Sequence, residues 1–171
     1  MQERGSMKIR HFLLFALLGV VLVCTGCTGG TRDHLAYRER DVCLVIEGTV
    51  RGFAFSAELC RVSDASGKRD TLRYLAPASL AEVTLTRDPD GGLRLSSGEL
   101  LRVCGADEVE GMLLPIRLLF DTPADVETIR RTADGCTQLT LTGGITMTLS
   151  PDGLPTALLS PDASLKITEK R

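Results

Sequence analysis

The sequence predicts a mainly β protein (α+β) in which antiparallel hairpins surround one short helical insert. Three observations support this fold class. Apolar and polar residues alternate along most of the chain after residue 41, which is the period of a half-buried strand. Gly, Pro, Asp and Ser cluster between these stretches, as they do in turns. The spacing of apolar residues becomes helical between about residues 106 and 132.

Length and composition narrow the class of protein. The 171 residues carry a net charge of −2, contain no Trp and include two Tyr. This length suits a single domain. Proteins that bind nucleic acid need a basic face to neutralise phosphates, so we expect no nucleic-acid partner. The hydrophobic content of 43% excludes a highly charged disordered chain.

The first 26 residues have the pattern of a signal peptide, which is expected to be helical. Lys8 and Arg10 precede an apolar run at 12–23, which is shorter than the roughly 20 residues of a membrane-spanning helix. Met7 is an alternative start of the chain. This segment predicts export across the cytoplasmic membrane.

Residues 24–27 (Cys-Thr-Gly-Cys) resemble the lipobox of bacterial lipoproteins, in which a small residue, here Gly26, precedes the modified Cys27. Cys24 stands where Leu is usual. The resemblance implies cleavage before Cys27, a diacylglycerol on its sulfur, and a lipidated tether over 27–40. Two acyl chains form a stable anchor, so the expected partner is a bacterial cell membrane. The alternatives are a secretory peptide cut elsewhere and an uncleaved anchor.

The first hairpin of the mature domain (41–171) can be derived residue by residue. Alternating apolar positions occupy 42–50 and 53–59, on either side of Arg51-Gly52. A two-residue turn places Val50 opposite Phe53 and brings every apolar residue of both strands to one face. A shift of one residue would destroy that face. The register of this hairpin is therefore a firm consequence of the pattern.

The same register places Cys43 opposite Cys60 at a non-hydrogen-bonded pair, where Cα atoms lie about 4.5 Å apart and a disulfide can form. Export also favours an oxidising compartment. We predict a Cys43–Cys60 disulfide, with two free thiols as the alternative. A second pair, Cys104–Cys136, flanks the helical insert and is a further hypothesis without a register argument. The cysteine spacings do not match a structural metal site, and we expect no metal.

Further strands are expected at 71–75, 81–87, 93–96, 99–104, 136–141, 145–149, and near 155–160 and 163–168. A three-residue loop at 142–144 pairs Leu141 with Ile145 and keeps the apolar faces aligned.

Within the helical insert, apolar residues from Val109 to Phe120 have helical spacing, and Pro115 is expected to kink or break the helix. Thr122-Pro123 has the pattern of a second helix start, with an end at Gly135.

This layout resembles the Lol-carrier-like superfamily of extracytoplasmic lipoproteins. The resemblance rests on the lipobox, the hairpins, the Ala76–Leu80 step between strands, the helical insert and the turn at 151–155, and covers roughly 41–168. It implies a curved antiparallel sheet, an open half-barrel closed by the short helical insert over an apolar cavity. Members of this superfamily bind acyl chains or have no known ligand. The sequence departs from the carriers because it is expected to be anchored.

Two functions follow as hypotheses. The first is a non-catalytic binding module for a lipid, an acyl chain or another apolar ligand, with Ile46, Phe53, Phe55 and Met112 as candidate cavity lining. The second is an envelope scaffold with a filled core that works through its surface. No enzyme activity and no cofactor are expected. His34 is the one histidine after the export segment, and no nucleophile motif or Gly-rich phosphate loop is present.

Overall fold

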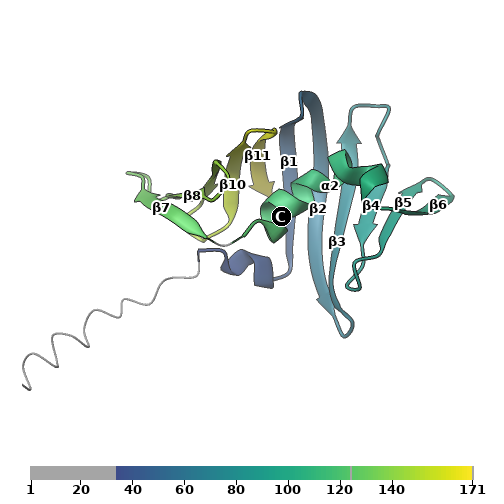
Figure 1. Cartoon of the computed structure of the whole chain (residues 1–171), viewed down its shortest axis with the longest axis horizontal. Coiled ribbons are helices and arrows are strands. Elements are labelled where there is room, and N and C mark those ends of the chain that lie inside the picture. Colours follow the sequence, from purple (N-terminus) through teal and green to yellow (C-terminus); the bar gives the residue numbers. More distant parts are fainter. Residues whose placement is uncertain (1–33, 124, 171) are drawn as a thin grey trace, which may run out of the picture. The chain divides into compact units, whose positions relative to one another are not determined.

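The computed structural model describes residues 34–123 and 125–170, and the expectations for residues 1–33 lie outside the described part. The chain divides into two units, Met1–Asp33 and His34–Arg171, and the account below concerns the second. In that unit eleven strands form a single antiparallel sheet with one short helical segment, which confirms the mainly β class (Figure 1).

The elements follow one another in a simple order. They are η1 (Ala36–Glu39), β1 (Val42–Val50), β2 (Phe53–Asp64), β3 (Gly67–Ala76), β4 (Thr84–Arg87), β5 (Leu93–Ser97), β6 (Leu100–Cys104), η2 (Asp107–Val109), α2 (Glu110–Ile116), η3 (Arg117–Asp121), β7 (Val126–Arg131), β8 (Thr137–Leu141), β9 (Ile145–Leu149), β10 (Pro155–Ser160) and β11 (Ala163–Glu169).

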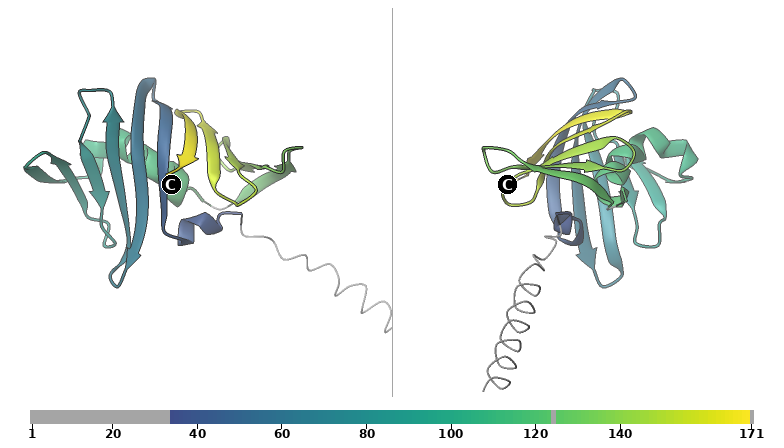
Figure 2. Two further views of the ribbon diagram at one scale, coloured as in Figure 1. Left: turned by 180° about the vertical axis from the view of Figure 1, so that it is seen from behind. Right: turned by 60° about the vertical axis from the view of Figure 1, so that its left-hand side comes forward.

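The sheet order is β6-β5-β4-β3-β2-β1-β11-β10-β9-β8-β7. Every neighbouring pair is consecutive in sequence except β1 and β11, which join the two halves of the sheet. The two edge strands, β6 and β7, are consecutive in the chain. The helical segment between them, residues 107–121, therefore has to cross from one half to the other over one face of the sheet (Figure 1). The sheet curves around that face as an open half-barrel (Figure 2).

The predicted register of the first hairpin is confirmed. Val50 pairs with Phe53 and Cys43 with Cys60. The three-residue loop is also confirmed, because Leu141 pairs with Ile145. These pairings put the apolar positions of β1, β2, β8 and β9 on the concave face, where they form the core with the helical segment.

The prediction of a second helix at 122–135 was wrong. Residues 126–131 form the edge strand β7, which pairs with β8 through Ile129 opposite Leu139. Most side chains of β7 are exposed on both faces, so its sequence lacks the alternation that reveals a strand. Pairing with β8 stabilises the extended conformation of β7, because the backbone of β7 provides hydrogen-bond partners for the N–H and C=O groups along the free side of β8.

Two smaller expectations also need correction. The strand expected at 81–87 begins only at Thr84, because residues 77–83 form consecutive turns after the cis Ala76–Pro77 bond.

Pro115 does not end the helix. The backbone continues into the π turn η3, and the N–H of Arg117 donates to the carbonyls of Leu113 and Leu114. The helical path therefore continues past the proline to Asp121.

Candidate functional site

The two ends of the half-barrel differ in chemistry. We call the end with η1, the start of β1 and the end of β11 the base. The opposite end, with the β1–β2 turn and the β10–β11 turn, is called the rim. The backbone N–H of Arg51 donates to the carbonyl of Asp162 at 2.7 Å and joins the two turns of the rim. The helical segment starts at the rim and ends at the base.

At the base, Asp70 is the centre of a buried group of charges. It is 1% exposed and accepts two hydrogen bonds from Arg61, at 2.7 Å and 2.9 Å. Arg87 donates to the same carboxylate at 2.6 Å and also pairs with Asp121 at the end of the helical segment. Arg61 lies 3.8 Å above the ring of Phe120. Buried ion pairs around Asp70 therefore join strands β2, β3 and β4. The partly exposed Arg87–Asp121 pair and the Arg61–Phe120 contact connect this network to the last helical turn.

The short η1 helix completes the base. Tyr37 donates its hydroxyl hydrogen bond to the carbonyl of Leu119 at 2.5 Å, and burial raises the pKa of this tyrosine. Arg38 donates to the carbonyls of Leu119 at 2.8 Å and Thr122 at 2.6 Å. The carbonyl end of a helix carries partial negative charge, which compensates the buried guanidinium. The C-terminal end of the helical segment is thus held by η1 as well as by the sheet.

At the rim, the start of the helical segment covers an apolar pocket of about 300 Å³. Its walls come from the first hairpin, from β3 and the turn after it, and from residues 108–112. The lining residues are Val50, Arg51, Phe53, Phe55, Tyr74, Leu80, Glu108, Val109, Gly111 and Met112. The hydroxyl of Tyr74 lies 3.5 Å from the carbonyl of Met112, and burial raises the pKa of Tyr74 to about 12.

The structure brings three of the four predicted lining residues to this pocket: Phe53, Phe55 and Met112. Phe55 and Tyr74 form an aromatic pair at its wall, with ring centres 5.7 Å apart. Ile46 is the exception. It is fully buried in the middle of β1, opposite Ala57 and Ile167, and does not reach the pocket. Helix residues such as Ile116 and Leu119 fill the concave face below the pocket.

Arg51 is a site residue that sequence analysis missed. It occupies the first position of the β1–β2 turn, where φ is +49°, and Gly52 follows with φ of +80°. Such two-residue turns favour Asn, Asp or Gly at the first position, so an arginine there was a signal that could have been used. The Arg51 side chain lines the apolar pocket and a second, polar hollow of about 340 Å³ on the other side of the turn.

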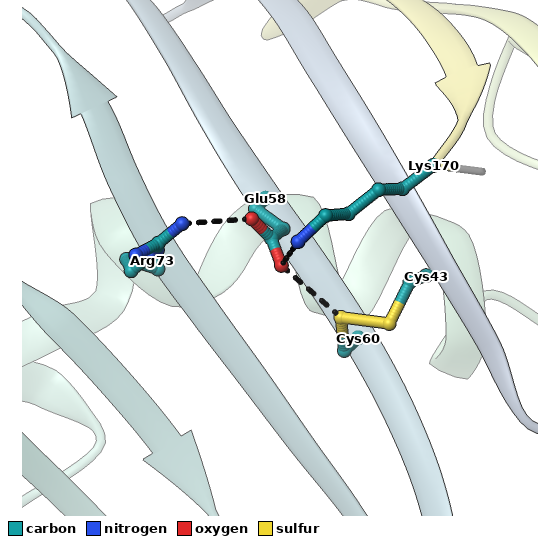
Figure 3. Close-up of a disulfide and its surroundings, with 5 residues drawn as sticks. All are labelled: Cys43, Glu58, Cys60, Arg73 and Lys170. Carbon is teal, nitrogen blue, oxygen red and sulfur yellow. Dashed lines mark hydrogen bonds and ion pairs between the residues drawn. A yellow bond between two sulfur atoms is a disulfide. The ribbon is translucent and has the colours of Figure 1, made fainter.

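The disulfide prediction is confirmed on the convex face of the sheet (Figure 3). The Cα atoms of Cys43 and Cys60 lie 4.1 Å apart. Beside the disulfide, Glu58 accepts hydrogen bonds from Lys170 at 2.6 Å and Arg73 at 3.0 Å. The hydrogen bond from Lys170, with that from Arg73, lowers the pKa of the Glu58 carboxyl. This cluster links β1, β2, β3 and the end of β11 on the face opposite the pocket.

The hypothesis of a second disulfide was wrong, because Cys104 and Cys136 are free thiols. Cys104 ends the edge strand β6, whereas Cys136 precedes β8 near the other edge of the sheet. The two flank the helical insert in sequence, but the insert crosses the sheet and carries its ends apart. The predicted lipidation site, Cys27, lies outside the described residues.

The described residues offer few other sites. Within 34–123 and 125–170, no group of three His, Cys, Asp or Glu side chains is placed to hold a metal ion. In the same residues, no helix has the length and hydrophobicity needed to cross a bilayer.

Comparison with known proteins supports the fold alone. No protein-family model and no curated protein matches the chain. Among solved structures, the chain is similar to an uncharacterized conserved protein from Thermus thermophilus. The two are 15% identical, with a TM-score of 0.50 over 81% of this chain and 83% of the other. A similarity at this level of identity indicates a shared curved sheet and leaves the function to be argued from the pocket.

Proposed function

We propose that the protein is a membrane-anchored extracytoplasmic lipoprotein that binds a single acyl chain, or another slender apolar ligand, in the rim pocket. The observation that carries this proposal is the apolar pocket between the first hairpin and residues 108–112. Its aromatic and aliphatic walls suit a hydrocarbon chain. Ligand sites in proteins are typically concave, mostly apolar and few in number.

The size of the pocket limits the ligand. Small-molecule sites span roughly 300–1,000 Å³, and about 300 Å³ lies at the lower limit of that range. The space below the pocket is taken up by Leu113, Ile116 and Leu119, all of which are buried. A ligand with one chain therefore suits the site better than a lipid with two or three chains.

The proposed anchor is compatible with this site. The described domain begins at His34, next to η1 at the base. The pocket lies at the other end of β1, a strand of nine residues that spans about 30 Å. The described domain therefore starts at the end of β1 that lies away from the pocket.

The anchor is tested by metabolic labelling of full-length protein with an alkyne analogue of palmitate. We expect labelling that is lost in Cys27→Ala and retained in the matched control Cys104→Ala. Unchanged labelling of the Cys27→Ala variant would contradict lipidation at this residue.

The pocket is tested by native mass spectrometry of the full-length protein, extracted in a steroid detergent that has no alkyl chain. We expect a bound acyl species in the wild type and its loss in Met112→Trp, because the larger ring fills the pocket. Leu101→Trp, on an exposed position of β6, is the control that should keep the ligand. A wild-type protein that never carries or binds palmitate would argue against the binding function.

An envelope scaffold is the second candidate, and one observation favours it. Leu100, Leu101 and Val103 are exposed on the edge strand β6, where an apolar surface can serve as a protein contact. Under this alternative, Leu101→Trp would disturb the function in cells, whereas Met112→Trp would leave it intact.

A further inference from the structure

We propose that the ligand of the rim pocket is an anionic amphiphile with a single chain, and that Arg51 binds its carboxylate or phosphate headgroup. This inference rests on the proposed function and adds the chemical class of the ligand. Among residues 34–123 and 125–170, Arg51 is the one cationic residue that lines the pocket. A chain inserted between Phe55, Val109 and Met112 would place its polar end at the rim, where Arg51 stands.

The position of Arg51 is fixed by its backbone. Its N–H donates to the carbonyl of Asp162 at 2.7 Å, and its φ is +49°. Residues other than glycine rarely adopt this conformation, which persists where the surroundings impose it. The turn thus holds a guanidinium beside an apolar pocket at a position where Asn, Asp or Gly would be easier to accommodate.

Most hydrogen-bond donors of Arg51 remain available to a ligand. A guanidinium has five N–H donors, and Glu110 takes one of them at 3.2 Å. Both side chains of this pair are about half exposed, at 51% and 50%, so the pair is weak. A carboxylate or phosphate can instead accept two parallel hydrogen bonds from the guanidinium.

Among the described residues, one carboxylate lines the apolar pocket, that of Glu108, and it is already engaged. Glu108 accepts hydrogen bonds from Arg102 at 2.8 Å and from the backbone N–H of Gly105 at 3.1 Å. Glu110 is therefore the carboxylate that competes with an anionic headgroup for Arg51.

The space beside Arg51 suits a polar group. The second hollow at the rim, about 340 Å³, shares Arg51 with the apolar pocket. Its lining includes the hydroxyl-bearing residues Thr49, Ser160 and Ser164 and one carboxylate, that of Asp162. An amphiphile could therefore place its chain on the concave side of the turn and its headgroup over the turn, with Arg51 between them.

The test uses full-length protein in membranes and three photoactivatable probes with the same sixteen-carbon chain. The probes are an alkyl carboxylate, an alkyl phosphate and the neutral alcohol, at mildly alkaline pH. Adducts on peptides covering 50–55 and 106–113 are quantified and normalised to the probe present in the membrane. We expect about tenfold more adduct from the anionic probes than from the alcohol.

Two variants sharpen the result. Arg51→Gln should reduce adducts of the anionic probes about tenfold and leave those of the alcohol unchanged. Glu110→Gln should raise the anionic adducts a few-fold, because it removes the competing carboxylate. Lys166→Gln removes an exposed cation on β11 that lines neither hollow, and as the control for a general change in charge it should leave all three labels unchanged. The ratio of carboxylate to phosphate adducts distinguishes a free fatty acid from a lipid monophosphate.

Equal labelling by the acid and the alcohol would overturn the role of Arg51 while leaving the binding function intact. An Arg51→Gln variant that loses both labels equally would also overturn it, because that result indicates a structural effect. Labelling by none of the three probes would contradict the proposed binding function itself.

Discussion

The two ends of the helical segment are attached to the sheet in opposite ways. At the base, residues 117–122 contact Arg61 and Arg87 of the network around Asp70 and are also held by η1. At the rim, residues 107–112 cover an apolar pocket, and Arg51–Glu110, a half-exposed ion pair, connects them to the first hairpin. The difference indicates that the two ends of the helical segment have different roles. The base stabilises the fold, while the rim has fewer fixed contacts and can adapt to a ligand.

Two tyrosines make the contrast quantitative, because each donates its hydroxyl towards a carbonyl of the helical segment. At the base, Tyr37 lies 2.5 Å from the carbonyl oxygen of Leu119. At the rim, Tyr74 lies 3.5 Å from that of Met112. The first is a short hydrogen bond and the second is at the limit of one. The same residue type thus fastens one end of the helical segment more tightly than the other.

The largest effect is expected at the base. Asp70→Asn keeps the shape of the side chain but leaves Arg61 and Arg87 buried without their full counter-charge. We expect a loss of about 3–5 kcal/mol in the free energy of unfolding, measured by urea denaturation. Glu110→Gln at the rim is the matched control and should cost less than about 1 kcal/mol. Equal losses in the two variants would contradict the difference between base and rim.

The disulfide is expected to stabilise the whole domain without affecting the pocket. Cys43 and Cys60 are separated by 17 positions, and closing a loop of this length contributes about 3 kcal/mol in the chain-entropy model. The double variant Cys43→Ala/Cys60→Ala should lose that amount in denaturation while still binding palmitate. Cys104→Ala/Cys136→Ala, which removes two free thiols, is the control. A disulfide variant that keeps its stability would show that the hairpin register alone is sufficient.

The tyrosine pair gives a smaller, direct comparison. Tyr37→Phe should destabilise the domain by about 1 kcal/mol, because it removes a short buried hydrogen bond to the carbonyl of Leu119, which keeps Arg38 as its other donor. Tyr74→Phe should cost less than about 0.5 kcal/mol, because its hydroxyl contact is long. Thermal denaturation of both variants measures the difference. If Tyr74→Phe proved the more damaging change, the rim would be the more tightly fastened end.

The pH dependence of the free energy of unfolding should also report the burial of the Tyr74 hydroxyl. Burial raises its pKa in the folded protein to about 12, whereas tyrosine in an unfolded chain ionises near pH 10. Between these values the unfolded state releases a proton that the folded state keeps. The contribution of Tyr74 is therefore complete below about pH 10 and is lost as the pH rises towards 12. Denaturation at about pH 9 and about pH 11 should show this decline in the wild type and a smaller one in Tyr74→Phe. An identical decline in both would place the effect elsewhere.

The correct predictions came from patterns within short stretches of the sequence. Alternation in β1 and β2 and the two-residue turn between them determine the register, and the register determines the Cys43–Cys60 pair. Three of the four predicted pocket residues followed from the same face and from the spacing of the helix. The prediction for Ile46 was wrong because alternation shows only on which face of the sheet a side chain lies. Whether that side chain lines the pocket or packs against the helix depends on where the helix crosses the strand.

The base was missed because its residues look like ordinary surface charges in sequence. Arg61 nevertheless continues the buried series of Phe55, Ala57 and Leu59, and it pairs across the strands with Asp70. A charge on the apolar face of a hairpin, opposite a charge of the other sign, was the available signal. The sequence of β7 shows no comparable pattern, because most of its side chains are exposed. Its extended conformation depends on pairing with β8, which is not visible in the sequence of β7 alone.

Hydrogen exchange of the full-length protein, followed by mass spectrometry with and without palmitate, tests the central claim most directly. The account predicts that the amides of residues 107–112 exchange faster than those of 117–122 in the absence of ligand. Palmitate should slow exchange at 107–112 and in the β1–β2 turn, and leave 117–122 unchanged. Equal exchange at the two ends, or protection by palmitate at the base instead of the rim, would contradict it.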